Sequence, residues 1–155
     1  MPNITLRDAV EEDLEQIHRI ESDLYPTPWT FNFFRIMFHI NEDLFIVAVD
    51  DDELIGYAVG EIEKRGKVNN PRKAGHVMNI AVQSRYQGMG VGTMLLDDIE
   101  NRFLSKGADI AYLEVRESNR RAQHVYRHRG YEYVRTAENY YGDEDGFIMT
   151  KKLEP

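Results

Sequence analysis

The chain has 155 residues, of which 42% are hydrophobic and 30% charged, a composition typical of one globular domain with its own core. Its 27 acidic residues outnumber 19 basic ones, and the net charge of −8 argues against a nucleic-acid partner. It contains no cysteine, which excludes disulfides, a thiol nucleophile and thiolate metal ligands. No apolar run approaches the ~18 residues of a membrane span and no secretory leader is visible, so we expect a cytoplasmic protein without a membrane partner.

The N-terminal part of the chain predicts one strand and two helices. Ile4 and Leu6 alternate in a short strand, and Asp8 can cap the helix that follows. The apolar face of this helix consists of Leu14, Ile17, Ile20 and Leu24. Two prolines end it, and residues 31–40 predict a second short helix that is rich in Phe and Met.

The middle of the chain predicts a hairpin followed by a strand and a long helix. Residues 44–49 and 54–61 read as strands that an acidic turn joins. A polar loop is expected over residues 64–73. Residues 76–82 form the next predicted strand, and residues 91–105 the helix after it.

The C-terminal part predicts a strand at 110–115, a helix at 119–129 and two final strands at 131–135 and 147–153. The residues of this helix expected to face inward are Ala122, Val125 and Tyr126. The whole order is strand, helix, helix, three strands, helix, strand, helix, two strands. It predicts a mixed α/β fold whose sheet has helices on both faces.

Three alternating glycines separate the strand at 76–82 from the helix at 91–105. Gly88, Gly90 and Gly92 let several amide N–H groups converge at a helix start, where an anion is the favoured guest. A Walker loop does not fit because no lysine follows the second glycine. A dinucleotide fingerprint fits poorly because the sixth place, counted from Gly88, is Thr93. A glycine-rich turn without a ligand remains the plain structural alternative.

The spacing Gln87-x-x-Gly90-x-Gly92 resembles the acetyl-coenzyme A pyrophosphate loop of the GNAT superfamily of N-acetyltransferases. Further segments resemble its ribosomal-protein alanine N-acetyltransferase branch and the archaeal protein N-terminal acetyltransferases. These segments are 79–82, 113–119, 122–126, 130–131 and 139–141. The resemblance covers nearly the whole chain. It implies a single domain over residues 1–155 with the GNAT fold, a mixed, mostly antiparallel central sheet of about seven strands flanked by about four helices.

The resemblance implies acetyl-coenzyme A as cofactor and coenzyme A as product. The residues that would hold it are Ile80, Ala81, Val82, Gln87, Gly88, Met89, Gly90, Val91, Gly92, Thr93, Asn119 and Tyr126. The strand residues would pair with the pantetheine arm, the loop from Gly88 to Thr93 would wrap the pyrophosphate, and Tyr126 would stand beside the thioester sulfur. Asn119 is equally well explained as the N-cap of its helix.

Acetylation of an amine needs a proton acceptor for the amine and a proton for the departing thiolate. Glu114 shares strand parity with Ile110 and Tyr112, on a face that is otherwise apolar and aromatic, and the resemblance implies that it is the general base. By the same resemblance Tyr126 would be the general acid, and His76 would help to move the proton through water. The alternatives are an exposed glutamate, an aromatic core residue and a structural histidine.

Two segments would shape the acceptor site by resemblance. Tyr25, Pro26 and Trp29 lie between the first two helices, as does the family segment that lines the pocket for the first residue of a peptide. Tyr140 and Tyr141 correspond to tyrosines that grip the peptide backbone in protein N-terminal acetyltransferases. Edge packing is the alternative for the tyrosine pair.

A metal site is not expected. His124 and His128 lie one helical turn apart, a spacing found in zinc sites. The residues between them lack the glutamate of a zinc-protease helix, and no third ligand is evident. A solvated helix face is the simpler explanation.

The resemblance implies an acyltransferase that transfers acetyl to the N-terminal amine of proteins or peptides by direct attack in a ternary complex. An α-amine titrates about 2.4 units below a lysine, so its neutral form costs roughly 3 kcal/mol less at pH 7 and favours an N-terminal acceptor. The alternatives are a lysine or polyamine-like small-amine acetyltransferase and a non-catalytic acyl-coenzyme A-binding subunit. Association with a ribosome or an auxiliary subunit stays open.

Overall fold

The computed structural model describes residues 2–155. The chain divides into two compact units. The first unit contains the residues up to Glu61 together with Asn79–Ile99, and the second contains Ile62–Met78 and Glu100–Pro155. No helix of the described residues is long and apolar enough to cross a membrane.

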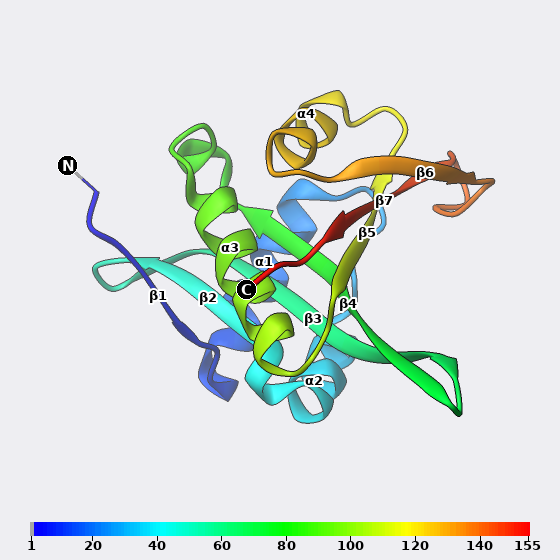
Figure 1. The fold of residues 1–155 in the computed structure, drawn as a ribbon. Coiled ribbons are helices and arrows are strands. Elements are labelled where there is room, and N and C mark those ends of the chain that lie inside the picture. Colours follow the sequence, from blue (N-terminus) through cyan, green and yellow to red (C-terminus); the bar gives the residue numbers. More distant parts are fainter. Residues whose placement is uncertain (1) are drawn as a thin grey trace. The chain divides into compact units, whose positions relative to one another are not determined.

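The first unit is built around a buried hairpin (Figure 1). Its elements are β1 (Ile4–Asp8), α1 (Leu14–Leu24), α2 (Phe31–Ile40), β2 (Phe45–Asp50), the first part of β3 (Glu53–Lys67), the last part of β4 (Asn70–Val82) and the start of α3 (Val91–Ser105). β2 pairs antiparallel with both β1 and β3. Phe45, Ile46 and Val47 are fully buried, so both faces of β2 lie in the core.

The start of α1 differs from the sequence prediction. Asp8 is the last residue of β1, and a 3₁₀ turn precedes α1. Asp13 organises this turn: its carboxylate accepts the Val10 N–H at 2.8 Å and two bonds from the Arg7 guanidinium at 2.7 and 3.0 Å. Burial of the Asp13 carboxylate is tolerated because these donors replace its water. The expectation that Asp8 caps the helix is therefore wrong.

The second unit contains the C-terminal strands and one helix. Its elements are the remaining parts of β3, β4 and α3, with β5 (Ile110–Arg116), α4 (Arg120–His128), β6 (Glu132–Ala137) and β7 (Gly146–Lys152). β7 lies between β5 and β6 and pairs antiparallel with both (Figure 1). β4 pairs parallel with β5 where His76 meets Tyr112.

The polar loop expected over residues 64–73 is wrong. β3 and β4 continue through this region and leave only a tight turn at residues 68–69. Residues 64–73 are polar because they are exposed to solvent on both strands, and not because they lack secondary structure. The seven strands are ordered β1-β2-β3-β4-β5-β7-β6 in one mostly antiparallel sheet, which with four α-helices confirms the fold class predicted from the sequence.

Candidate active site

The glycine loop connects β4 to α3 within the first unit. A 3₁₀ turn at Ser84–Tyr86 and a further turn lead into α3, which begins at Val91 as predicted. Gly88 and Gly90 both have a φ of +84°, a left-handed conformation that costs an L side chain roughly 1–2 kcal/mol. The backbone conformation therefore favours glycine at these two positions.

The start of α3 offers open backbone donors. Its first N–H groups have no intrahelical carbonyl to bind, and they lie at the positive end of the helix dipole. A Cβ placed on Gly90 would meet nothing within 4 Å, so a ligand can approach the backbone there. The Gln87 amide instead donates to the Val82 carbonyl at 3.0 Å. Gln87 thus braces the loop, while the amides of residues 88–93 are suited to an anion.

A buried carboxylate fastens the α1–α2 turn inside the first unit. Glu21 is only 2% exposed, and it accepts hydrogen bonds from the Asn79 side chain at 2.8 Å, from the Trp29 N–H at 2.9 Å and from the Tyr57 hydroxyl. Burial of a carboxylate is tolerated because three donors replace its water. Glu21 is not among the residues predicted from the sequence, although a glutamate in the apolar stripe of α1 is a signal for it.

The α1–α2 turn itself contains the predicted acceptor residues Tyr25, Pro26 and Trp29. The Tyr25 hydroxyl donates to the Ile80 carbonyl at 2.6 Å. The Trp29 ring packs against Phe34 of α2 with the centroids 5.1 Å apart, whereas Pro26 is exposed. The structure therefore places Tyr25 directly against one of the strand residues predicted to contact the cofactor.

A separate cavity of about 540 Å³ in the first unit contains none of the predicted site residues. Its lining includes Arg19 and Asp23 of α1 and an ion pair between Arg85 and Glu53. Arg85 is paired with Glu53, and Arg19 with Glu15 of the same helix, so neither arginine is an uncompensated charge that would select an acyl donor.

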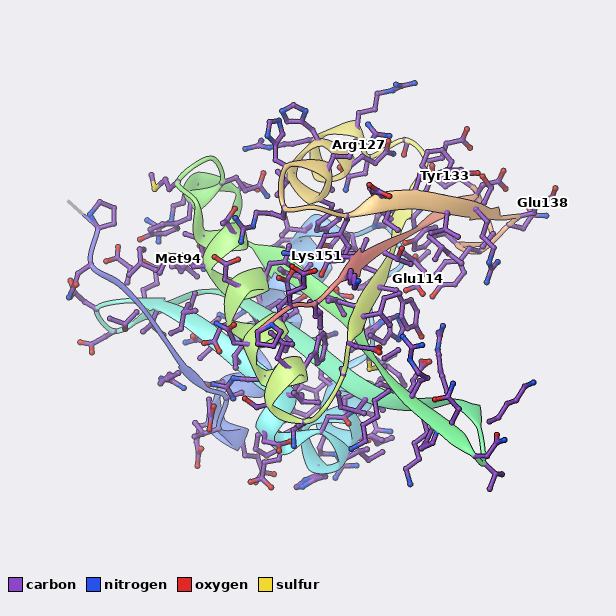
Figure 2. All side chains as sticks on the ribbon, in the orientation of Figure 1. Met94, Glu114, Arg127, Tyr133, Glu138 and Lys151 are labelled. Atoms are coloured by element: carbon purple, nitrogen blue, oxygen red, sulfur yellow. The ribbon has the colours of Figure 1, made fainter. Side chains whose placement is uncertain are left out.

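Glu114 lies at the centre of a cluster of ionisable side chains in the second unit. Alternation along β5 buries one set of side chains and turns Ile110, Tyr112 and Glu114 to the other face, as predicted. Figure 2 labels Glu114 beside this strand. Because His76 of β4 is in register with Tyr112, its Nε2 lies 2.7 Å from Glu114 Oε1. The two side chains are only 14% and 11% exposed. The pair is thus a mostly buried carboxylate–imidazole contact.

His76 is held by further groups on β3 and β5. Its ring stacks on Tyr112 with the centroids 4.3 Å apart and the planes at 3°. Its Nδ1 lies 3.7 Å from Glu63 Oε1, and the Tyr112 hydroxyl donates to the same carboxylate. The Arg65 guanidinium lies 4.6 Å from the centre of the Tyr112 ring. Glu63 and Arg65 are not among the predicted site residues because they lie beyond residue 61, where the sequence predicts that the strand ends.

Contacts within the cluster shift the pKa values of Glu63, Tyr112 and Tyr140. Burial alone would raise the pKa of Glu63, but hydrogen bonds from Tyr112 and Arg65 outweigh it and hold that pKa below its ordinary value. Burial, and then the hydrogen bond to Glu63, raise the pKa of Tyr112. Burial, followed by the charge of Glu114 and a hydrogen bond to it, raises the pKa of Tyr140 to about 12. Both phenols are therefore neutral donors near pH 7, and Glu63 is ionised.

The loop between β6 and β7 brings the tyrosine pair to this cluster. Tyr140 hydrogen-bonds Glu114, and its ring meets that of Tyr141 edge-on at 4.9 Å. The Arg116 guanidinium lies 4.3 Å from the centre of the Tyr141 ring and donates to Glu144 at 2.9 Å. These contacts fix the loop to the end of β5. Tyr140, one of the predicted acceptor residues, is in contact with the predicted base.

Helix α4 presents Asn119 and Tyr126. The Asn119 side chain accepts the Ala122 N–H at 3.1 Å, which confirms its predicted role as N-cap. Tyr126 is half-buried, and burial raises its pKa to about 12, so its phenol keeps its proton near pH 7. The prediction of the inward-facing residues of α4 was only partly right. Gln123, only 4% exposed, is the buried residue of this helix, and its amide donates to the Arg116 and Glu117 carbonyls at the end of β5.

The two helix histidines do not form a metal centre in the structure. The rings of His124 and His128 meet edge-on with centroids 4.3 Å apart, and both are exposed. Within residues 2–155, no group of three or more His, Asp or Glu side chains is arranged to hold a metal ion.

The predicted site residues thus form two groups. The first unit holds the open amides of the glycine loop, the strand residues Ile80–Val82 and the aromatic α1–α2 turn. The second unit holds His76, Glu114, Asn119, Tyr126 and the Tyr140–Tyr141 pair. An amide-lined helix start suits a phosphate-bearing donor, and a buried carboxylate with phenol donors suits proton transfer at an amine. Such groups suit an enzyme that transfers an acyl group to nitrogen.

A family model described as "Acetyltransferase (GNAT) family" matches residues 14–131, which is most of the chain. The chain therefore belongs to the GNAT acetyltransferase family and is an acyltransferase. An N-alpha-acetyltransferase of Sulfurisphaera tokodaii is 33% identical over 96% of this chain and 92% of its own length. A [ribosomal protein bS18]-alanine N-acetyltransferase of Haemophilus influenzae is 28% identical over 88% and 90%.

Solved structures share the fold. Ard1 from Thermoplasma volcanium superposes with a TM-score of 0.90 at 23% identity, covering 98% of this chain and 99% of Ard1. A chain of the NatC complex, solved with Gag peptide and coenzyme A, superposes with a TM-score of 0.88 at 22% identity, covering 98% and 99%. At these identities the likeness concerns the fold alone. The relatives and the fold together confirm the resemblance drawn from the glycine spacing and its flanks.

Proposed function

We propose that the chain acetylates the N-terminal amine of proteins or peptides with acetyl-coenzyme A as donor. The observation that carries this proposal is the contact of 2.7 Å between His76 and Glu114, both mostly buried, with Tyr140 bonded to the same carboxylate. Relatives named N-alpha-acetyltransferase support the choice of acceptor. The cytoplasmic location and assembly with an auxiliary subunit or ribosome stay predictions.

The donor's diphosphate fits the start of α3. The amides of residues 88–93 would hold it, because they point from a helix N-terminus and Gly90 leaves the approach open. Ile80, Ala81 and Val82 would pair with the pantetheine arm, and Asn119 would hydrogen-bond the cofactor through its free capacity beyond the Ala122 bond. When bound, acetyl-coenzyme A supplies the activated acetyl thioester.

Glu114 would take the proton from the acceptor amine, through a water molecule. While Glu114 is ionised it can only accept hydrogen bonds, so His76 Nε2 and the Tyr140 hydroxyl donate to it and hold it in place. The neutral amine would then form a bond to the acetyl carbon as the carbon–sulfur bond breaks, and the nitrogen would lose its second proton to solvent water, from which Tyr126 is later reprotonated. Tyr126, whose pKa of about 12 keeps it protonated, would give its proton to the departing thiolate.

The acceptor's first residue would lie against the α1–α2 turn. Tyr25 and Trp29 are ordered there by a hydrogen bond and by ring packing, and Pro26 stiffens the exposed wall. Tyr140 and Tyr141 would bind the peptide backbone beside Glu114. An α-amine rather than a lysine suits a single carboxylate base, because its neutral form costs roughly 3 kcal/mol less at pH 7.

Three matched peptides test the proposal. The first has a free N-terminus and no lysine, the second a blocked N-terminus and one lysine, and the third both groups free. After incubation of the whole chain with acetyl-coenzyme A, mass spectrometry should find acetyl on the first and third peptides, at the α-amine. Acetyl on lysine alone would contradict the acceptor, and no acetyl on any peptide would contradict the activity.

A further inference from the structure

A cavity of about 370 Å³ opens on the face of β5, β6 and β7 in the second unit, and Glu114 and Tyr140 form part of its wall. Its aliphatic wall consists of Ile110, Val134 and Ile148. Two arginines, Arg65 and Arg135, also line it. The cavity thus joins the proposed base to an apolar surface with two cationic groups.

The two arginines differ in how they are held. Arg65 lies over the Tyr112 ring and 3.3 Å from Glu63. Arg135 is exposed, and within residues 2–155 no carboxylate lies within ion-pairing distance of it. Since the protein carries a net charge of −8, an unpaired cation in this cavity is a local exception to an acidic molecule.

An irregularity in β6 directs Arg135 into the cavity. The register between β6 and β7 shifts between Tyr133 and Arg135, so Val134 has no partner opposite it. A bulge of this kind re-aims side chains, and both Val134 and Arg135 line the cavity as a result.

The sheet register fixes the distance from the base. Arg135 is opposite Ile148, and Ile148 is opposite Glu114. Two strand spacings separate Arg135 from Glu114, about 10 Å between backbones. An extended peptide advances about 3.3 Å per residue, so a chain whose amine lies at Glu114 reaches Arg135 with its third or fourth residue.

We propose that this cavity binds the acceptor segment that follows the reacting amine, and that it favours an acidic side chain at the third or fourth residue. The inference rests on the proposed function, because it takes Glu114 as the position of the amine. The aliphatic wall holds the stem of the side chain, and the Arg135 guanidinium pairs with its carboxylate. Arg65 adds positive charge to the same cavity.

Peptide triplets test this selectivity. Three peptides share a free N-terminus and differ only by Glu, Gln or Lys at the third residue, and steady-state kinetics give KM and kcat for each. At low salt the Glu peptide should have a KM about two- to five-fold below that of the Gln peptide, the range of a partly exposed ion pair, and added salt should reduce the difference. Values of kcat should be equal.

Arg135→Gln should abolish the difference between the Glu and Gln peptides, and Arg135→Glu should favour the Lys peptide. Arg127→Glu, on α4 and outside the cavity lining, is the control of equal charge change and should keep the wild-type preference (Figure 2). Equal KM values for all three peptides in the wild type, or an unchanged preference in Arg135→Glu, would overturn the inference alone. No acetylation of any peptide would overturn it together with the proposed function.

Discussion

The glycine loop of the first unit and the carboxylate cluster of the second unit are built in opposite ways. The loop depends on backbone geometry: two glycines at φ +84° and a helix start with open amides. The cluster depends on side chains that β3, β4 and β5 bring together through sheet register. A site made of backbone amides is formed by residues that are consecutive in the sequence. A site made of side chains from several strands forms only when those strands pair.

Because the two regions are built differently, we expect them to have different functions, one in binding the donor and the other in proton transfer. Amides at a helix start bind charge without titrating, so the loop should control affinity for the donor. Ionisable groups held by phenols and an arginine are suited to proton transfer, so the cluster should control the rate. Substitutions in each region should therefore separate binding from turnover.

Glu114→Gln should have the largest effect. It keeps the shape of the side chain but removes the proton acceptor, so kcat should fall about 10²- to 10³-fold while the dissociation constant for coenzyme A stays the same. Glu117→Gln, at an exposed position after the same strand, is the matched control and should keep wild-type kinetics. A Glu114→Gln enzyme with unchanged kcat would remove this residue from the proposed role.

Gly90→Ala and Gly142→Ala form a matched pair across the two regions. Their φ values are +84° and +86°, and a Cβ at either position meets nothing within 4 Å. Both substitutions should lower the free energy of unfolding by about 1–2 kcal/mol through backbone strain. Only Gly90→Ala should also weaken coenzyme A binding, by about tenfold, as measured by calorimetry. Equal affinity of the two variants for coenzyme A would contradict the proposal that the glycine loop binds the donor.

Tyr112→Phe should have the smallest effect, within the cluster itself. The Tyr112 hydroxyl helps to lower the pKa of Glu63, so its removal should raise that pKa, which carboxyl NMR titration can follow. A lowered folded-state pKa stabilises the fold fully above the unfolded pKa, and this stability is lost as the pH falls through the folded pKa.

The variant should therefore show a weaker loss of stability on acidification. The difference from wild type should stay below about 1 kcal/mol in denaturant unfolding because Glu63 is partly exposed. Tyr133→Phe, on the exposed face of β6, provides the control. An unchanged Glu63 titration in Tyr112→Phe would contradict the hydrogen bond as the cause.

Local patterns predicted the fold nearly completely, because helix periodicity, strand alternation and glycine stops act over a few residues. Two errors arose where tertiary context decides: Asp13, not Asp8, has the donors that organise the start of α1, and residues 64–73 are exposed strands, not a loop. Strand alternation and the family resemblance predict Glu114 and His76 as site residues, but they do not predict that the two side chains are in contact. Their contact, and the contact of Glu63 with His76, depend on how strands that are distant in the sequence are aligned in the sheet.

The most direct test is calorimetric titration of coenzyme A into the wild-type chain and into Glu114→Gln. It tests whether the glycine loop binds the donor independently of the carboxylate cluster. We predict one binding site with the same dissociation constant in both proteins, because in the proposed site the backbone amides of the first unit would hold the diphosphate and the carboxylate would take no part in binding it. No uptake of coenzyme A by the folded wild-type chain, or a loss of binding in Glu114→Gln, would contradict this account.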